Sequence, residues 1–120
     1  MVRSRRIMIV EDDYMISVLF EQILFDAGYV VAGPFANSDD ALSFLGAGTV
    51  DAALLDINLG GGDWAYPVAV QLAARQIPFA FVTAYLERQV DPRFRDRPLL
   101  YKPCRVEEIE ETLQGLVAKS

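Results

Sequence analysis

Five short apolar runs alternate along the chain with segments of helical periodicity, and this alternation constrains the fold more than any other feature. The predicted strands lie at residues 6–10, 30–32, 52–55, 79–83 and 99–101. Runs that are apolar almost throughout are typical of strands covered on both faces. Strands that alternate with helices predict right-handed crossovers and a parallel sheet between two helical layers. The 120 residues are therefore expected to form one doubly wound α/β domain.

Four helical segments have clear one-sided apolar patterns, and they follow the first, second, third and fifth strands. Their predicted ends lie near Gly28, Gly46, Arg75 and Val117. Asn37 or Ser38 is expected to cap the second helix, and Pro67 suits the first turn of the third. The segment 85–97, after the fourth strand, is harder to interpret because Pro92 interrupts its apolar stripe. An irregular or short helix is expected there.

Composition excludes several classes of function. The chain has no histidine, which removes Ser-His-Asp and Cys-His catalysis and any histidine metal site. Its net charge of −6 argues against direct binding to nucleic acid. No apolar run is long enough to span a membrane, and no signal peptide is visible, so a cytoplasmic location is expected. One cysteine, Cys104, agrees with this expectation. Residues 1–5 are expected to form a flexible tail.

Chemically useful residues follow four of the predicted strands. Acidic residues 11–13 follow the first strand, Asp56 the third, Thr83 ends the fourth and Lys102 follows the fifth. In a parallel sheet these positions meet at the carboxyl edge, where ligands of such folds bind. Clustered carboxylates repel one another, and a divalent cation with oxygen ligands, usually Mg²⁺, relieves the repulsion. The arrangement favours a phosphoryl site whose nucleophile is a carboxylate.

Four segments resemble the signatures of response-regulator receiver domains: residues 9–13, 54–59, 82–84 and 101–103. The resemblance covers essentially the whole chain, residues 1–120. It implies a flavodoxin-like five-stranded sheet of order 2-1-3-4-5. It also implies a phosphorylation-dependent switch of a two-component system or phosphorelay, with a histidine kinase or phosphotransfer protein as the phosphoryl donor. The chain would not be an enzyme beyond its own phosphoryl transfer and dephosphorylation.

The resemblance implies a role for each site residue. Asp56 would accept the phosphoryl group. Mg²⁺, with Mn²⁺ as the alternative cation, would be held by Glu11, Asp12, Asp56 and the backbone carbonyl of Asn58. Thr83 and Lys102 would contact the phosphoryl group, and the Lys102–Pro103 peptide would be cis. The simpler interpretation of the acidic residues, taken alone, is a solvated loop or a helix N-terminus.

The chain departs from the family at its fifth strand. Receivers typically carry an aromatic residue three positions before the conserved lysine, where this chain has Leu99. Tyr101, directly before the lysine, is either a displaced substitute or a packed or exposed ring. The sequence also resembles a subgroup of stand-alone receivers with a Phe-Ala-Thr-Gly fourth strand and a Pro-x-Leu-x-Lys-Pro fifth strand, although Val82 and Ala84 replace the small pair.

Three further residues are expected to modulate the site. Tyr85 could shield an acyl phosphate from water, Trp64 could cover the pocket or be partly buried, and Pro103 follows the conserved lysine. The arginine-rich segment 85–97 has two interpretations. It is either a solvated loop, or a segment that orders on phosphorylation and offers a basic face to a partner.

Two rival functions stay open. A Mg²⁺-dependent phosphatase would also use an aspartate nucleophile, but it typically needs a second Asp two residues later, where this chain has Asn58. A receiver-like adaptor would signal without phosphorylation. In either signalling role the chain acts through contacts with an unidentified downstream protein, and a homodimer stays open. Direct contact with nucleic acid or a membrane is not expected.

Overall fold

The computed structural model describes residues 4–84 and 90–118. The elements, in chain order, are β1 (Arg6–Val10), α1 (Tyr14–Asp26), β2 (Val30–Phe35), α2 (Ser38–Ala47), β3 (Ala52–Asp56), α3 (Tyr66–Ala74), β4 (Phe79–Thr83), a 3₁₀ helix (Pro92–Phe94), β5 (Leu99–Tyr101) and α4 (Val106–Val117). Strands β1, β4 and β5 have the predicted bounds, while β2 and β3 extend beyond theirs.

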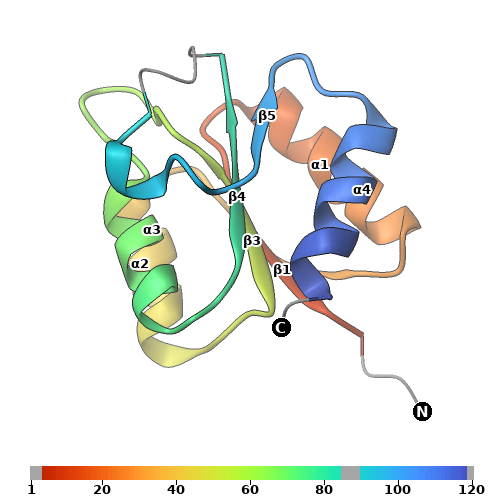
Figure 1. The fold of residues 1–120 in the computed structure, drawn as a ribbon, viewed down its shortest axis with the longest axis horizontal. Helices are drawn as coiled ribbons and strands as arrows, with labels where there is room; N and C mark the ends of the chain where they lie inside the picture. Colours follow the sequence, from red (N-terminus) through yellow and green to blue (C-terminus); the bar gives the residue numbers. More distant parts are fainter. Residues whose placement is uncertain (1–3, 85–89, 119–120) are drawn as a thin grey trace.

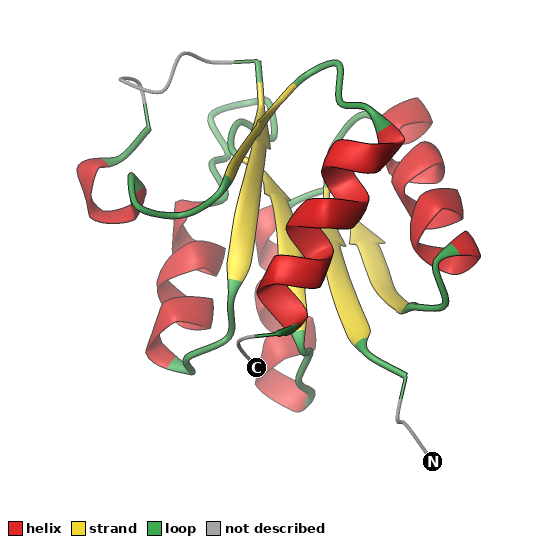
Figure 2. Cartoon of the chain, turned by 45° about the vertical axis from the view of Figure 1, so that its right-hand side comes forward, coloured by secondary structure: helices red, strands yellow, loops and turns green. Residues whose placement is uncertain are grey.

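The five strands form one parallel sheet in the order β2-β1-β3-β4-β5, which confirms the predicted topology. Helices α2 and α3 cover one face, and α1 and α4 cover the other (Figure 1). Figure 2 shows the same layers with α4 in front of the sheet. All strands run in one direction, so their carboxyl ends share one edge of the sheet.

Side-chain alternation divides the apolar core between the two faces. In β1, Ile7 and Ile9 join the cluster beneath α1 and α4, while Met8 and Val10 join the cluster beneath α2 and α3. Every residue of β3 and β4 is buried. A strand covered on both sides needs apolar residues at every position, which explains why these runs do not alternate in polarity.

Strand β2 continues three residues beyond its predicted end. The strand runs through Gly33 and Pro34 to Phe35, with an irregularity in its pairing to β1. β2 lies at the edge of the sheet, where a proline without an N–H group is tolerated. Gly33 has φ +101°, and a Cβ there would lie 2.8 Å from the Phe35 nitrogen, so this position requires glycine.

The helix ends follow ordinary capping rules, with one correction. Asn37 caps α2 by accepting a hydrogen bond from the Asp40 nitrogen at 2.8 Å. The predicted end at Gly46 is wrong, because the helix continues to Ala47 and Gly48 forms the C-cap. In α1 the expected apolar stripe is only partly buried, and Leu19 is half exposed.

The described part of the segment after β4 is packed and is not a solvated loop. Val90 and Phe94 are buried against the core beneath α2 and α3. Pro92 begins the short 3₁₀ helix, where it removes no hydrogen bond, and Asp91 caps it by accepting from the Arg93 nitrogen at 2.9 Å. Residues 85–89 lie outside the described part.

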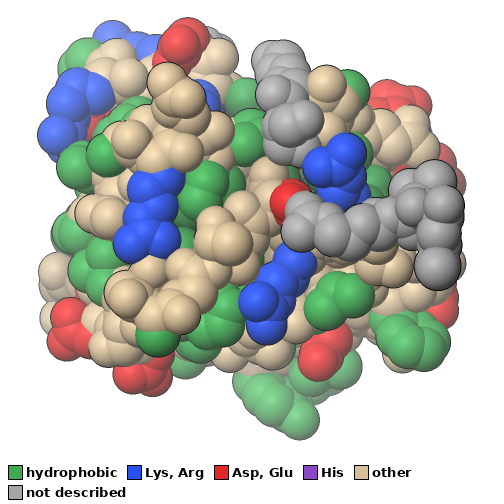
Figure 3. Space-filling view, turned by 90° about the horizontal axis from the view of Figure 1, so that it is seen from below, with side chains coloured by type: hydrophobic (Ala, Val, Ile, Leu, Met, Phe, Trp, Pro, Cys, Tyr) green, Lys and Arg blue, Asp and Glu red, His purple; other side chains and the backbone are tan. Residues whose placement is uncertain are grey.

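The surface at the amino ends of the strands mixes both signs of charge with apolar side chains (Figure 3). The tail predicted for residues 1–5 stays a prediction for residues 1–3, which the structure does not describe. The Arg5 carbonyl, by contrast, accepts a hydrogen bond from the Val30 nitrogen at 2.9 Å. None of the described helices has the length and apolar character needed to cross a membrane.

The burial of the central strand predicts how much its side chains contribute to the free energy of unfolding. Leu54→Ala should lower the free energy of unfolding by about 3 kcal/mol, because it removes a fully buried side chain and leaves a cavity. Leu19→Ala makes the same chemical change at a half-exposed position and should cost less than about 1 kcal/mol. Urea denaturation of both variants measures the difference, and equal losses would contradict the assignment of Leu54 to the core.

Candidate functional site

The strand ends bring four predicted residues to one edge of the sheet. Glu11 directly follows β1, Asp56 ends β3, Thr83 ends β4 and Lys102 follows β5. The pairing of β3 with β4 sets Asp56 beside Val82. The Lys102 nitrogen donates to the Thr83 carbonyl at 2.9 Å, which fixes the start of the loop after β5.

Three carboxylates meet at this edge. Glu11, Asp12 and Asp56 each place one oxygen within 4.8 Å of the others. Glu11 and Asp56 are only 2 % and 6 % exposed, whereas Asp12 faces solvent. Two hydrogen bonds hold Glu11: its nitrogen donates to the Phe35 carbonyl at 2.9 Å, and its Oε2 accepts from the Asp13 nitrogen at 3.1 Å.

Asp13, the third acid of the triplet, is used differently. It is the N-cap of α1, and its Oδ1 accepts a hydrogen bond from the Ile16 nitrogen at 3.2 Å. The helix-terminus interpretation is therefore correct for this residue. The triplet thus supplies two site carboxylates and one helix cap.

Lys102 joins the two buried carboxylates. Its Nζ lies 2.9 Å from Glu11 Oε1 and 3.1 Å from Asp56 Oδ2, and the second contact is a hydrogen bond. Burial alone lowers the pKa of Lys102, but the two carboxylates outweigh it and raise that pKa above its usual value. The ammonium group therefore stays charged where a phosphoryl group would arrive.

Asp56 is destabilised as an anion. Burial raises the pKa of Asp56 to about 8, and the neighbouring Glu11 adds to the rise, while Lys102 partly offsets it. Glu11 Oε1 is buried and, despite its ion pair with Lys102, accepts no hydrogen bond from the described residues. Carboxylate oxygens such as this one and those of Asp56 are the ligands that a hard divalent cation prefers.

The loop after β3 passes over this cluster. The Asn58 side chain accepts a hydrogen bond from the Gly60 nitrogen at 2.9 Å, and Asn58 forms an antiparallel bridge with Trp64. The side chain is thus part of the loop's own structure. Metal binding by the Asn58 carbonyl stays a prediction.

The structure bears on the predictions for Trp64 and for the Lys102–Pro103 peptide, but not on the one for Tyr85. Trp64 is 41 % exposed and stacks on Tyr66 with ring centroids 6.3 Å apart, so it is partly buried. The Lys102–Pro103 peptide is cis, as the resemblance implied. Tyr85 lies outside the described residues, and its shielding role stays a prediction.

Sequence reasoning missed two residues near the site. Asp63, in the loop after the three glycines, accepts hydrogen bonds from both the nitrogen and the hydroxyl of Ser38. Ser38 had been predicted only as a possible helix cap. The partners are 25 residues apart. No local pattern of the sequence connects them.

Comparison with known proteins decides the family. A model of the response regulator receiver domain matches residues 7–114. The chain belongs to this family.

Two solved structures share the fold of this receiver domain, and one curated relative matches it in sequence. The solution structure of SdrG from Sphingomonas melonis Fr1 is 40 % identical, with a TM-score of 0.85 over 98 % of this chain and 99 % of that one. The receiver domain of PhyR from Erythrobacter litoralis is 25 % identical, with a TM-score of 0.84 over 96 % and 91 % of the two chains. The transcriptional regulatory protein PdtaR from Mycobacterium tuberculosis is 24 % identical over 119 residues. The receiver domain spans 96 % of its own length but 58 % of PdtaR in that match.

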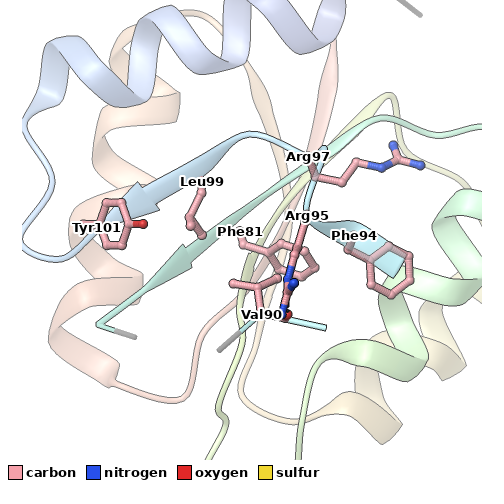
Figure 4. Close-up of a pocket in the computed structure, with 7 residues that line it drawn as sticks. All are labelled: Phe81, Val90, Phe94, Arg95, Arg97, Leu99 and Tyr101. Atoms are coloured by element: carbon pink, nitrogen blue, oxygen red, sulfur yellow. Dashed lines mark hydrogen bonds between the residues drawn. The ribbon is translucent and has the colours of Figure 1, made fainter. Parts of the chain in front are cut away.

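The departure at Leu99 is accompanied by a pocket beside β5 (Figure 4). Leu99 is partly buried and Tyr101 is 45 % exposed, so neither position holds a buried aromatic ring. The pocket measures about 240 Å³ and is lined by Phe81, Val90, Phe94, Arg95, Arg97, Leu99 and Tyr101. A cavity of about 150 Å³ suffices to bind benzene, so one large side chain fits here.

An aromatic stack connects this pocket to the loop of the site. The Tyr66 ring lies between Trp64, at 6.3 Å, and Phe94, at 6.2 Å. The Tyr66 hydroxyl accepts a hydrogen bond from the Asp91 nitrogen at 3.1 Å. The loop after β3 and the segment 90–97 therefore share a packed contact.

The raised pKa of Asp56 predicts how stability depends on pH. The folded protein holds a proton on Asp56 up to about pH 8, whereas the unfolded chain loses it near pH 4. The stability that this proton contributes is fully present below about pH 4 and is lost as the pH rises through about 8. Without divalent cations, the free energy of unfolding should fall between pH 5 and 8.5 by about 4 kcal/mol more in the wild type than in Asp56→Asn. Urea denaturation in EDTA measures this, and parallel profiles would contradict the raised pKa.

Proposed function

We propose that this receiver domain is a phosphorylation switch in which Asp56 accepts a phosphoryl group from a histidine kinase or phosphotransfer protein. The observation that carries the proposal is the contact of the nearly buried Asp56 carboxylate with Lys102 at 3.1 Å, beside Glu11. A structural ion pair does not need a second buried carboxylate at the same lysine. A phosphoryl site does, because it must hold a cation as well.

The transfer follows from the chemistry of the donor. An Asp56 oxygen attacks the phosphorus of a phosphohistidine, the new P–O bond forms, the P–N bond breaks, and the imidazole leaves with the electron pair of that bond. Lys102 contributes positive charge to the phosphoryl oxygens, and the Thr83 hydroxyl donates a hydrogen bond to them. Thr83 is 2 % exposed and ends the strand next to Asp56. Residues 1–120 contain no histidine, so the donor phosphohistidine lies outside them.

The divalent cation of this site is proposed to be Mg²⁺, with Mn²⁺ as the alternative. Receiver domains bind Mg²⁺ at an acidic pocket, and the cluster of Glu11, Asp12 and Asp56 supports the same arrangement here. The Asn58 carbonyl is the proposed fourth protein ligand. When bound, the cation offsets the charge of the carboxylates and of the incoming phosphoryl group.

The switch is proposed to act through protein contacts and not as an enzyme. A phosphatase of this architecture needs an acid two residues after the nucleophile, and Asn58 cannot supply one. We propose that the signal passes to a downstream protein at the pocket beside β5, because the aromatic stack joins that pocket to the loop of the site. Neither nucleic acid nor a membrane is a proposed partner, and a homodimer is an alternative use of the same surface.

Phosphorylation at Asp56 can be measured directly. Incubation with Mg²⁺ and acetyl phosphate should add one acid-labile phosphoryl group to the wild type, detected as intact mass, and none to Asp56→Asn. Asp51→Asn is the matched control, because Asp51 precedes the same strand and its carboxylate accepts from the Arg6 nitrogen at 2.7 Å, away from the site. It should be modified like the wild type.

Two results would contradict this proposal. Modification of Asp56→Asn to the wild-type extent would place the phosphoryl group elsewhere. A wild type that binds no Mg²⁺ in calorimetry and gains no phosphoryl group from either acetyl phosphate or a histidine kinase would favour the phosphorylation-independent adaptor.

The proposed signalling route predicts a change in the segment 90–97. SdrG has been determined in a BeF3-activated conformation, so beryllofluoride is a suitable phosphoryl mimic. In this chain it should slow amide exchange across residues 90–97 several-fold, because the site loop contacts Phe94 through Tyr66. Tyr66→Leu should weaken that response while leaving the binding of beryllofluoride intact. Unchanged exchange in the wild type would contradict the route.

A further inference from the structure

The carboxylate of Asp63 connects the loop of the site to the start of α2. Its Oδ2 accepts a hydrogen bond from the Ser38 nitrogen at 2.9 Å, and its Oδ1 accepts one from the Ser38 hydroxyl. Ser38 is the first residue of α2 and is 8 % exposed. The amide and the hydroxyl of this buried residue thus both donate to one side chain from a distant loop.

The backbone of Asp63 also closes that loop. Its nitrogen donates to the Gly60 carbonyl at 2.9 Å, and its carbonyl accepts from the Leu59 nitrogen at 2.9 Å. Two residues later, the Ala65 nitrogen donates to the Ile57 carbonyl at 2.9 Å. The chain between Asp56 and Ala65 is therefore a closed loop, and Ser38 holds it from outside.

The loop lies against an acid of the proposed metal site. A Cβ on Gly60 would lie 3.3 Å from Asp12 Oδ2, a tight contact, and the φ of +83° at this position strains any residue with a side chain. The short segment 35–38 is bonded both to the acids and to the loop. The Phe35 carbonyl accepts a hydrogen bond from the Glu11 nitrogen, and the Ser38 nitrogen donates one to Asp63. Segment 35–38 thus helps to fix the distance between the acids and the loop.

Three consecutive glycines make this attachment important. Gly60, Gly61 and Gly62 have φ values of +83°, +59° and +82°. Glycines lose more conformational freedom on folding than any other residue, so such a loop has many competing conformations unless it is tied down. The Asp63–Ser38 contact restricts the loop immediately after the last glycine.

We propose that Asp63 is a positioning residue for the divalent cation: through Ser38 it holds the loop that carries Asn58 at the distance from Glu11, Asp12 and Asp56 that a single ion requires. Residues that orient metal ligands without touching the metal commonly change its affinity 10- to 100-fold when they are replaced. The proposal rests on the metal site of the proposed function and adds to it a residue that none of the expected signatures includes.

A purely structural role for Asp63 makes a different prediction. If Asp63 only satisfied the first amide of α2, its loss would destabilise the helix without changing the metal site. Asn37 provides the matched control, because it caps the same end of α2 through a separate hydrogen bond, which its side chain accepts from the Asp40 nitrogen at 2.8 Å. Replacing either residue with alanine should lower the melting temperature, since each removes a helix cap.

The experiment is calorimetric titration of the full chain with MgCl₂, with thermal unfolding of each variant measured in EDTA. Asp63→Ala should raise the Kd for Mg²⁺ about tenfold, whereas Asn37→Ala should leave it within twofold of the wild type. Asp63→Asn should restore most of the affinity, because an amide can accept from the Ser38 nitrogen and donate to the Ser38 hydroxyl oxygen. Ser38→Ala keeps one of the two bonds and should have an intermediate Kd; it serves as the test if Asp63→Ala does not fold.

Each other outcome is decisive. A wild-type chain that does not bind Mg²⁺ overturns the metal site and this inference together. A wild type that binds Mg²⁺, with Asp63→Ala and Ser38→Ala both binding equally well, overturns the inference alone. Equal weakening by Asp63→Ala and Asn37→Ala also overturns it, because the effect would then come from capping of α2.

Discussion

The burial of two carboxylates against one ammonium group is the constraint around which this edge of the sheet is built. Glu11 and Asp56 are held where water is largely excluded, and Lys102 contacts both. One positive charge does not balance two negative ones. Burial and the neighbouring Glu11 therefore raise the pKa of Asp56 well above the usual value for an aspartate, although Lys102 partly offsets the rise. The site is therefore incomplete by itself. A divalent cation would supply the missing positive charge and a partner for the buried Glu11 oxygen that accepts no hydrogen bond, and it would offset the charge of the phosphoryl group in the proposed switch.

Much of the fold was predictable because one physical requirement controls it. Strands buried on both faces must be apolar at every position, and β4 has the predicted bounds for this reason. The edge strand β2 was less predictable. Pairing on one side only tolerates Gly33 and Pro34, which in a central strand would mark an end. The site followed from the fold, since parallel strands bring Asp56, Thr83 and Lys102 to one edge regardless of how the loops run.

The remainder depends on contacts between segments that are distant in sequence. Three consecutive acids follow β1, and nothing in their residue types indicates that Asp13 caps α1 while Glu11 is buried beside Asp56. The direction of each side chain decides this, and the backbone after the strand sets that direction. Asp63 and Ser38 are a second case: each suits a turn or a helix start locally, and only the folded chain shows that they form one contact. Val90 and Phe94 are a third, because tertiary packing buries a stripe that proline interrupts.

The loop between β3 and α3 is the part of the structure on which both halves of the proposed switch depend. On one side it approaches Asp12 through Gly60 and is fixed to α2 through Asp63. On the other side Trp64 stacks on Tyr66, whose ring packs on Phe94 and whose hydroxyl binds the backbone of Asp91. We expect a shift of this loop at the proposed metal site to change the packing of Tyr66. In a receiver domain with leucine at position 99, this contact offers a physical connection between the phosphoryl site and the pocket beside β5 that needs no aromatic side chain on that strand.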